Sequence, residues 1–281
     1  MPDISDWFSC WIGLVVRVVK GSNLEEEAKA LAEQLFEDDT AKRARFISRL
    51  LDICALAQDK DILLIHNPGG WGTTKLENLL NWERSIIEGI STTIDKQGHS
   101  WSLMQYFRTD SGWWEIMKDI REQSKFFVSK ARIMAAELDF ITRHFKKLQV
   151  VMVGVSQGAG FSNAVLQHQG ELDRVYSIEL GMPFFYKSRR VITERILALD
   201  GNGLMPDALM EYDVPTIVRT YFTAPFRWFK YRLQGKRIKF TYCINVPGHD
   251  YNWDYPEVQR QIEEFLDIKF GTKSKTEVEA R

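Results

Sequence analysis

A G-x-S-x-G motif at residues 154–158 is the segment of this chain with the clearest chemical potential. The residues before it, 150–153, are apolar and mostly β-branched, which is typical of a strand buried in a parallel sheet. An apolar segment that can form a helix follows at 159–166. A serine on a sharp strand-to-helix turn exposes its hydroxyl, and small residues on both sides let the backbone pass closely. The motif predicts Ser156 as a nucleophile; an ordinary glycine-rich turn is the alternative.

His249 is the candidate base for this serine. It lies in a Pro-Gly-His-Asp-Tyr loop at residues 247–251, directly after an expected strand at 240–246. The carboxyl ends of parallel strands meet at one edge of a sheet, where catalytic groups gather. We therefore expect Ser156 and His249 to project from the same edge.

A glycine-rich loop, HNPGGWG at residues 66–72, follows the first expected strand of the sheet. The backbone amides of Gly70 or Trp71 could pair with the amide of Gln157 to hold an oxyanion. A phosphate-binding loop is the alternative, but the segment lacks both the Lys-Ser/Thr ending of a P-loop and the G-x-G-x-x-G spacing. His66 ends the strand and is expected to shape the loop.

In this chain order, the HNPGGWG loop, the G-x-S-x-G turn and the Gly-His loop resemble the α/β-hydrolase superfamily of lipases and esterases. The resemblance covers residues 61–270, and the Ser-Gln-Gly-Ala version of the turn also occurs in cutinase-like and lipase-like esterases. It implies Ser156 as nucleophile, His249 as general base, and an oxyanion hole formed by Gln157 and the Gly70–Trp71 region.

The acid that would orient His249 has no motif of its own. Members of the family usually carry an Asp after the strand that precedes the histidine strand, which here would be near residues 223–226, where there is no carboxylate. Some lipases place the acid at the end of the strand after the serine turn, where Glu179 lies. We predict Glu179 as this acid, with a salt-bridged strand-end carboxylate as the alternative role. The further candidates are Asp200 as second choice, then Asp213 and Asp250.

The elements that must position these residues alternate as in a layered α/β protein. Expected strands lie at 61–66, 101–107, 150–155, 175–180, 216–222 and 240–246, and expected helices at 24–36, 40–57, 74–90, 113–145, 188–199 and 256–270. Strands separated by helices imply a mostly parallel sheet that is covered on both faces. We predict a three-layer α/β-hydrolase-like fold with a mostly parallel central sheet and N-terminal helical additions.

Three parts of the chain are expected to differ in role. Residues 1–60 would form an apolar segment and helices packed on the main domain, residues 61–270 the catalytic domain, and residues 271–281 a disordered polar tail. The apolar run at 7–19 is too short to span a bilayer and is preceded by acidic residues, unlike a signal peptide. A buried strand or helix is favoured for it, with an interfacial membrane anchor or a dimer contact as alternatives.

Composition excludes several classes of function. The chain of 281 residues is 44% hydrophobic and 27% charged, typical of a soluble globular protein, and its net charge of −1 offers no basic field for nucleic acid. Three widely spaced cysteines, Cys10, Cys54 and Cys243, argue for a reducing compartment and against a disulfide framework or a zinc site. We expect a cytoplasmic protein without a metal or other cofactor and without a nucleic-acid partner.

A serine hydrolase acting on a carboxylic ester or thioester with an apolar acyl part is the function these residues favour. An amidase or peptidase would use the same residues. A catalytically impaired hydrolase-fold protein, acting in binding or at a membrane, is the alternative from another class. The aromatic and basic segment at 221–239 is expected to cap the site or lie on the surface, with peripheral membrane contact as the alternative.

Overall fold

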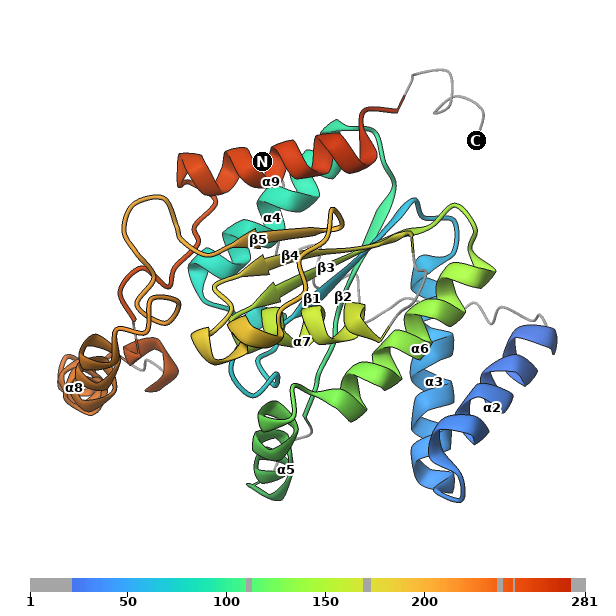
Figure 1. Ribbon diagram of the computed structural model, residues 1–281, viewed down its shortest axis with the longest axis horizontal. Helices are drawn as coiled ribbons and strands as arrows, with labels where there is room; N and C mark the ends of the chain where they lie inside the picture. Colours follow the sequence, from blue (N-terminus) through green and yellow to red (C-terminus); the bar gives the residue numbers. More distant parts are fainter. Residues whose placement is uncertain (1–21, 110–112, 169–172, 237–239, 245, 274–281) are drawn as a thin grey trace. The chain divides into compact units, whose positions relative to one another are not determined.

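The computed structural model of this chain describes residues 22–109, 113–168, 173–236, 240–244 and 246–273 (Figure 1). It consists of two compact units, Met1–Gln58 and Asp59–Arg281. The apolar run at 7–19 and residues 274–281 of the expected tail lie outside these ranges. The start of that tail is not disordered as expected, because Gly271 N donates to Asp267 O and Lys273 N to Gln97 O. The packing of the N-terminal region on the main domain stays a prediction. Among the described residues, no helix is long and apolar enough to cross a bilayer.

The N-terminal unit contains helices α2 (Ser22–Phe36) and α3 (Thr40–Ala57). Asp39 caps α3, because its side chain accepts a hydrogen bond from the Lys42 amide at 3.0 Å. The rings of Phe36 and Phe46 lie 5.4 Å apart and join the two helices. Helices α2 and α3 together form a short helical hairpin.

The second unit is built on a parallel sheet with the strand order β2-β1-β3-β4-β5. The strands are β1 (Ile62–Asn67), β2 (Trp101–Gln105), β3 (Gln149–Val155), β4 (Val175–Leu180) and β5 (Ile196–Leu199). The register pairs Asn67 with Gly154 and Val155 with Leu180, so β1, β3 and β4 end at the same edge. The chain reverses its direction of winding between β1 and β3, and ligands bind beyond the strand ends at such a switch point.

Helices cover both faces of the sheet, as Figure 1 shows. Helices α4 (Asn81–Lys96) and α9 (Pro256–Phe270) lie on one face, where Ile86, Ile90 and Val258 join Leu64 and other strand residues in one apolar core. Helices α6 (Val128–His144) and α7 (Gln157–Gln167) lie on the other face. All six residues of β1 are buried, because both of its faces are covered. The predicted three-layer α/β fold with a parallel sheet is confirmed.

Two of the expected strands are absent from the described sheet. Residues 216–222 belong to helix α8 (Val214–Leu233), which Asp213 caps by accepting a hydrogen bond from Thr216 N. Their β-branched and aromatic residues favour a strand locally, but the apolar spacing over the next turns is helical. Residues 240–246 contain the short 3₁₀ helix η3 (Phe240–Cys243) and a loop instead of the last strand.

Three of the expected helices also need correction. The helix expected at 74–90 is preceded by a separate 3₁₀ helix, η1 (Leu76–Asn78), and α4 begins only at Asn81. Residues 188–199 were expected to be helical, but they contain the end of the 3₁₀ helix η2 (Phe184–Arg189) and all of β5. The expected helix at 113–145 is divided into α5 (Trp113–Ser124) and α6. The division arises because Phe126 and Phe127 adopt positive φ angles of 58° and 57°, which an α-helix does not tolerate.

Candidate active site

Ser156 occupies the apex of the turn between β3 and α7. Its backbone has φ 52° and ψ −119°, a strained conformation for a residue with a side chain. The surrounding backbone holds this conformation: Ser156 N donates to Leu180 O at 2.8 Å, and Ser156 O accepts from Ala159 N at 2.9 Å. Such strain is typical of functional turns that present a side chain at a fixed point.

The two glycines of the motif are required by close contacts. A β-carbon at Gly154 would lie 2.6 Å from Gly158 O, and a β-carbon at Gly158 would overlap Asn67 O. Helix α7 can therefore start directly against the end of β1 only because Gly158 has no side chain. The spacing of the motif thus follows from packing between the turn, the helix and the neighbouring strand.

The glycine-rich loop after β1 lies against the serine. A β-carbon on Gly69 would lie 3.5 Å from the β-carbon of Ser156. Gly70 N donates to Gln157 Oε1 at 2.9 Å, and Ser156 Oγ donates to the same oxygen at 3.1 Å. The structure therefore brings Ser156, Gln157 and Gly70 together around one carbonyl oxygen. Trp71 follows in the same turn with an exposed side chain.

His249 reaches the same edge of the sheet. Its ring lies over Gly181, where a β-carbon would be 2.7 Å from His249 Cε1. Gly181 follows Leu180, whose carbonyl oxygen accepts the Ser156 amide. A glycine at position 181 thus allows the imidazole to approach the backbone that carries the serine.

The carboxylate beside His249 is Asp207. Its Oδ2 lies 2.8 Å from His249 Nδ1 and accepts the Tyr251 hydroxyl at 2.7 Å, while Oδ1 accepts Leu209 N at 2.9 Å. The Asp207 side chain is completely buried. A carboxylate at Nδ1 keeps the proton on that nitrogen and leaves Nε2 free to accept one.

Glu179 does not contact His249, which corrects the sequence-based expectation. Its side chain accepts from Arg190 Nε at 3.1 Å and from Asn163 Nδ2 at 3.0 Å. Asn163 is a residue of α7, so Glu179 faces the helix side of β4 rather than the His249 loop. Burial outweighs the attraction of Arg190 and raises the pKa of Glu179 to about 7. Glu179 is thus the buried ion-pair carboxylate that we considered as its alternative role.

The other candidate acids also have structural partners. Asp200 binds Arg190 Nη1 at 2.6 Å, and Asp213 caps α8. Asp250 accepts from Asn202 Nδ2 at 3.1 Å and from the Tyr255 hydroxyl at 2.5 Å. These contacts fix the loops around the site without an acid–imidazole contact.

Asp207 was missed because the strand before it was assigned as a helix. The acid was sought after the strand that precedes the His249 loop, and in the structure that strand is β5. Assigning a strand to 216–222 moved the expected position to 223–226. A signal was present, since the apolar tetrapeptide 196–199 is followed by Asp-Gly-Asn-Gly, which marks a strand end and turn.

Comparisons with known proteins leave the family open. The chain matches no protein-family model and no curated protein. Among solved structures it is similar to a Trichoderma reesei cutinase in complex with a C11Y4 phosphonate inhibitor. The two chains are 11% identical, the match covers 96% of this chain and 99% of the cutinase chain, and the TM-score is 0.42. At this level of similarity, inferences about function rest on the geometry of this chain.

Arg108 supports the loop that lies against the serine. It is buried, and its guanidinium donates to Pro68 O at 2.6 Å and to Gly70 O at 2.7 Å. The same group lies 5.5 Å from the ring centre of Phe127 and 5.6 Å from that of Phe161. Burial lowers the pKa of Arg108 to about 10, so it stays charged at neutral pH. The guanidinium group of Arg108 therefore fixes both carbonyl groups that flank Gly69.

Glu83 is a buried titratable group near His249. Its Oε2 accepts the Leu80 amide at 3.1 Å at the start of α4. Burial raises its pKa to about 7, against the effects of this hydrogen bond and of the charge on His249, which lower it. The folded protein therefore binds this proton more tightly than the unfolded chain does.

Glu83→Gln is expected to stabilise the protein selectively at high pH. Below the ordinary pKa of 4.5, Glu83 is protonated in both states. As pH rises from there through the folded pKa of about 7, wild type loses stability, because the unfolded chain ionises first. Glutamine removes this loss, which amounts to at most about 3 kcal/mol. Urea unfolding at pH 5 and pH 8 should show the gain mainly at pH 8.

Glu88→Gln on the same helix is the matched control for this experiment, because Glu88 is only partly buried. It should leave the difference between the two pH values unchanged. An equal gain at both pH values for Glu83→Gln, or no gain at pH 8, would contradict the account of Glu83.

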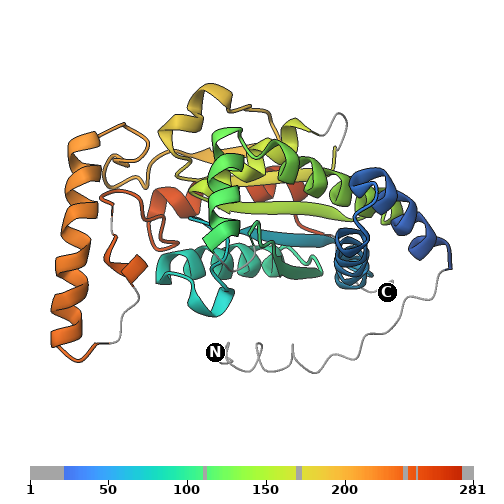
Figure 2. The same cartoon turned by 90° about the horizontal axis from the view of Figure 1, so that it is seen from below.

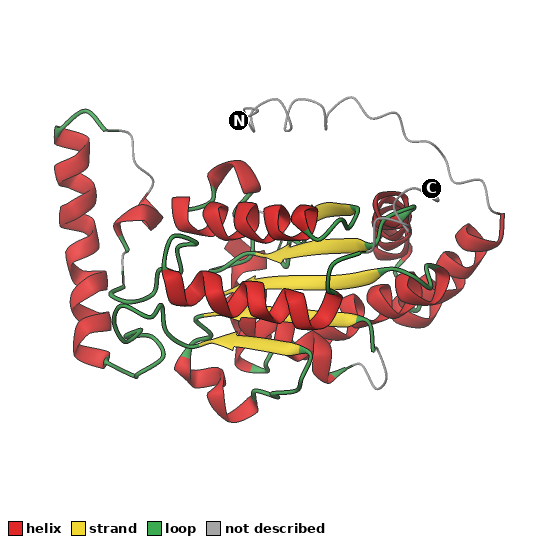
Figure 3. Ribbon diagram, turned by 90° about the horizontal axis from the view of Figure 1, so that it is seen from above, coloured by secondary structure: helices red, strands yellow, loops and turns green. Residues whose placement is uncertain are grey.

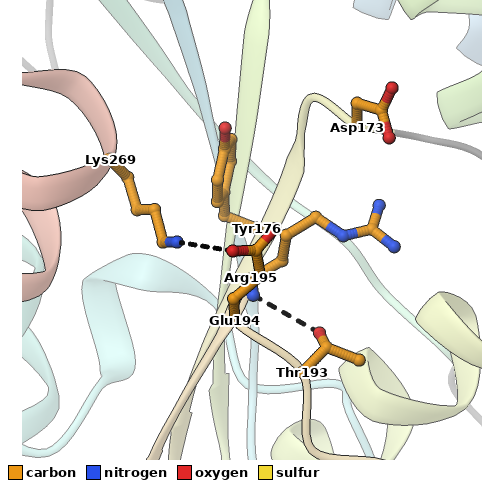
Figure 4. A pocket seen from close by; sticks show the side chains of 6 residues that line it. All are labelled: Asp173, Tyr176, Thr193, Glu194, Arg195 and Lys269. Atoms are coloured by element: carbon orange, nitrogen blue, oxygen red, sulfur yellow. Dashed lines mark hydrogen bonds and ion pairs between the residues drawn. The ribbon is translucent and has the colours of Figure 1, made fainter.

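A separate pocket lies at the opposite edge of the sheet (Figure 4). It includes Tyr176 near the start of β4 and Arg195 directly before β5, so it is at the amino ends of the strands. Its lining carries both signs of charge, including Glu194 and Lys269, which lie 3.9 Å apart. It is distinct from the edge that carries Ser156.

Proposed function

We propose that this protein is a serine hydrolase that cleaves a carboxylic ester or thioester. The observation that carries the proposal is the contact between His249 Nδ1 and Asp207 at the sheet edge where Ser156 is held in a strained turn. A nucleophile, a base and an orienting acid at one edge of an α/β sheet form the set of groups that acyl transfer needs.

In the proposed reaction, His249 Nε2 takes the proton of Ser156 as Oγ forms a bond to the substrate carbonyl carbon. Asp207 holds the imidazole and stabilises the imidazolium that forms. Collapse of the tetrahedral intermediate breaks the bond to the alcohol or thiol, which leaves with the proton from His249. Water then attacks the acyl-enzyme with the same base, releasing the acid and restoring Ser156.

The amides of Gln157 and Gly70 are the proposed oxyanion donors. Gln157 N lies at the start of α7, where the helix dipole favours negative charge. Gly70 N already donates to a carbonyl oxygen, Gln157 Oε1, which also accepts the Ser156 hydroxyl. We infer that this side-chain oxygen stands where a substrate carbonyl oxygen would bind, so the Gln157 side chain must move aside when substrate enters.

The discovery of Asp207 weakens the alternative of an impaired hydrolase-fold protein. That alternative rests on the lack of a carboxylate for His249 and on the two apolar and aromatic segments, and Asp207 removes the first of these grounds by supplying a carboxylate at 2.8 Å. Ester, thioester and amide substrates differ in their leaving groups, and comparing the rates of hydrolysis of the three classes distinguishes them.

Hydrolysis of p-nitrophenyl esters from acetyl to palmitoyl, together with acyl-thioesters and anilides, tests the proposal. We expect turnover of esters or thioesters with a saturable dependence on concentration, and slower turnover of the anilides. Absence of turnover of every substrate by folded wild-type protein would contradict the proposed activity. Preference for anilides would replace it with the amidase alternative.

Arg108→Lys is expected to lower kcat by about ten- to hundred-fold with a smaller change in KM, because a lysine cannot hold Pro68 O and Gly70 O together. The expected loss comes from displacement of the Gly70 amide relative to the oxyanion. Steady-state kinetics on an ester substrate measure it, with thermal unfolding recorded in parallel. A lower melting temperature with unchanged kcat would mean that Arg108 has only a structural role.

A further inference from the structure

Helix α8 carries a row of exposed apolar side chains, which we call the α8 stripe. Phe222 and Phe226 are 74% and 77% exposed, and the rest of the row is also exposed. The members recur at intervals of three or four residues and therefore share one face of the helix. They are Val218, Phe222, Phe226, Phe229 and Leu233.

The stripe points away from the rest of its unit. The buried residues of α8 are Thr220 and Ala224, and the helical period places both opposite Phe222. Figures 2 and 3 show α8 as a long helix beside the body of the unit, beyond the carboxyl ends of the strands. The small residues thus attach the helix, and its largest apolar groups face outward on the side of the candidate active site.

The charges on and after α8 have one sign. Residues 214–236 contain no Asp or Glu. By helical position, Arg219 and Lys230 flank the stripe on one side and Arg232 flanks it on the other. The exposed cations of the segment are Arg219, Arg227, Lys230, Arg232 and Lys236.

We propose that α8 docks this protein onto an anionic lipid surface. The stripe enters the boundary between headgroups and acyl chains, and the flanking cations contact headgroup phosphates. A helix with aromatic and aliphatic residues on one face and lysine and arginine beside them is typical of interfacial binding. Each cation near an anionic surface adds to the attraction.

Charge favours a lipid surface over a second copy of this chain as the occupant. Two α8 helices packed through their stripes would bring like-charged flanks together without a carboxylate from either helix. A bilayer with anionic headgroups supplies the opposite charge and a wide apolar phase for a single convex helix.

Docking through α8 would bring the edge with Ser156 and His249 toward the bilayer. Asp213, the cap of α8, follows Asp207 in the same connection after β5. If the proposed hydrolase activity holds, the substrate class would be esters carried in a lipid surface. This consequence rests on the proposed function, whereas the docking itself does not.

Co-sedimentation of the full chain with phosphatidylcholine vesicles, with and without phosphatidylglycerol, tests the docking. We expect binding to the anionic vesicles that falls with added salt. The affinity of the triple variant Phe222→Ser/Phe226→Ser/Leu233→Ser for these vesicles should fall by at least about ten-fold. The affinity of the double variant Arg219→Gln/Lys230→Gln should fall roughly ten-fold, and only for anionic vesicles.

Ile192→Ser/Ile268→Ser is the matched control, because these side chains are 71% and 69% exposed outside α8. It should bind vesicles as wild type does. All variants retain the apolar run at 7–19. Vesicle binding that is lost only in the α8 variants is therefore due to α8 and not to that run. Hydrolysis of a short soluble ester by the α8 variants should equal that of wild type, which separates docking from catalysis.

Three results would overturn the docking proposal. One is wild-type protein that does not bind anionic vesicles. The second is binding that the α8 substitutions leave unchanged. The third is a wild-type protein that does not bind vesicles but forms a dimer in sedimentation velocity, with the dimer lost in the triple variant. This result would assign the stripe to contact with a second copy of the chain.

Discussion

Ser156→Ala is expected to lower kcat/KM for ester hydrolysis by about 10⁴-fold or more. Alanine removes the only atom that forms a bond to the substrate in the proposed reaction. The turn itself should survive, because its hydrogen bonds are made by backbone atoms, from Ser156 N to Leu180 O and from Ala159 N to Ser156 O. Initial rates with a p-nitrophenyl ester, together with circular dichroism, measure the loss against an intact fold.

Ser162→Ala is the matched control, six residues further along the chain in α7. Ser162 Oγ donates to Gly158 O at 3.0 Å and accepts Asn67 Nδ2 at 2.7 Å, so it acts in packing. Its loss should cost about 1–3 kcal/mol of stability and leave kcat largely intact. Substantial activity in Ser156→Ala would exclude Ser156 as the nucleophile.

Asp207→Asn is expected to lower kcat by about 10⁴-fold, because an amide no longer holds the imidazole in the tautomer that leaves Nε2 unprotonated. Asn can keep one oxygen toward the Leu209 amide, and its Nδ2 then takes the place of Oδ2 and can donate to the Tyr251 hydroxyl oxygen, so the fold should be retained. The rate measured across pH should stay low where wild type is active.

Glu179→Gln separates the two candidate acids. It removes the carboxylate that pairs with Arg190 and should lower stability by about 1–3 kcal/mol, with kcat near that of wild type. The opposite pattern, low kcat in Glu179→Gln and normal kcat in Asp207→Asn, would restore Glu179 as the catalytic acid and contradict the role we give to Asp207.

The central strands could be predicted because burial on both faces makes nearly all of their residues apolar. A strand covered on both faces, such as β1 or β3, reads as a continuous apolar run bounded by turn residues. The turn at Ser156 was predictable as well, because its two glycines are needed for contacts that any such turn makes.

The elements after β4 were harder to predict because their local signals conflict with their environment. β5 has four residues, too few for a clear alternation of apolar and polar side chains, and it is an outermost strand of the sheet. Within α8, the β-branched and aromatic residues at 216–222 favour a strand, and only the spacing over the whole helix reveals its exposed stripe.

Asp207 was missed as the partner of His249 for a related reason. The contact between His249 and Asp207 joins residues 42 positions apart, and it depends on where β5 ends. Glu179 looked suitable because it follows the serine turn by one strand, but alternation along β4 directs its side chain toward α7. The wrong assignments at 188–199 and 216–222 together moved the predicted acid away from Asp207, whereas Ser156 and His249 were proposed from motifs of their own.

Reaction of the full chain with a fluorophosphonate, followed by intact and peptide mass spectrometry, tests the central claim most directly. The hydroxyl of an activated serine displaces fluoride from phosphorus, and the adduct cannot be cleared as an ester can. We predict one adduct per chain, located on Ser156, formed much more slowly in Asp207→Asn and at the wild-type rate in Glu179→Gln. A folded wild-type protein that forms no adduct, or one labelled at another residue, would contradict the account.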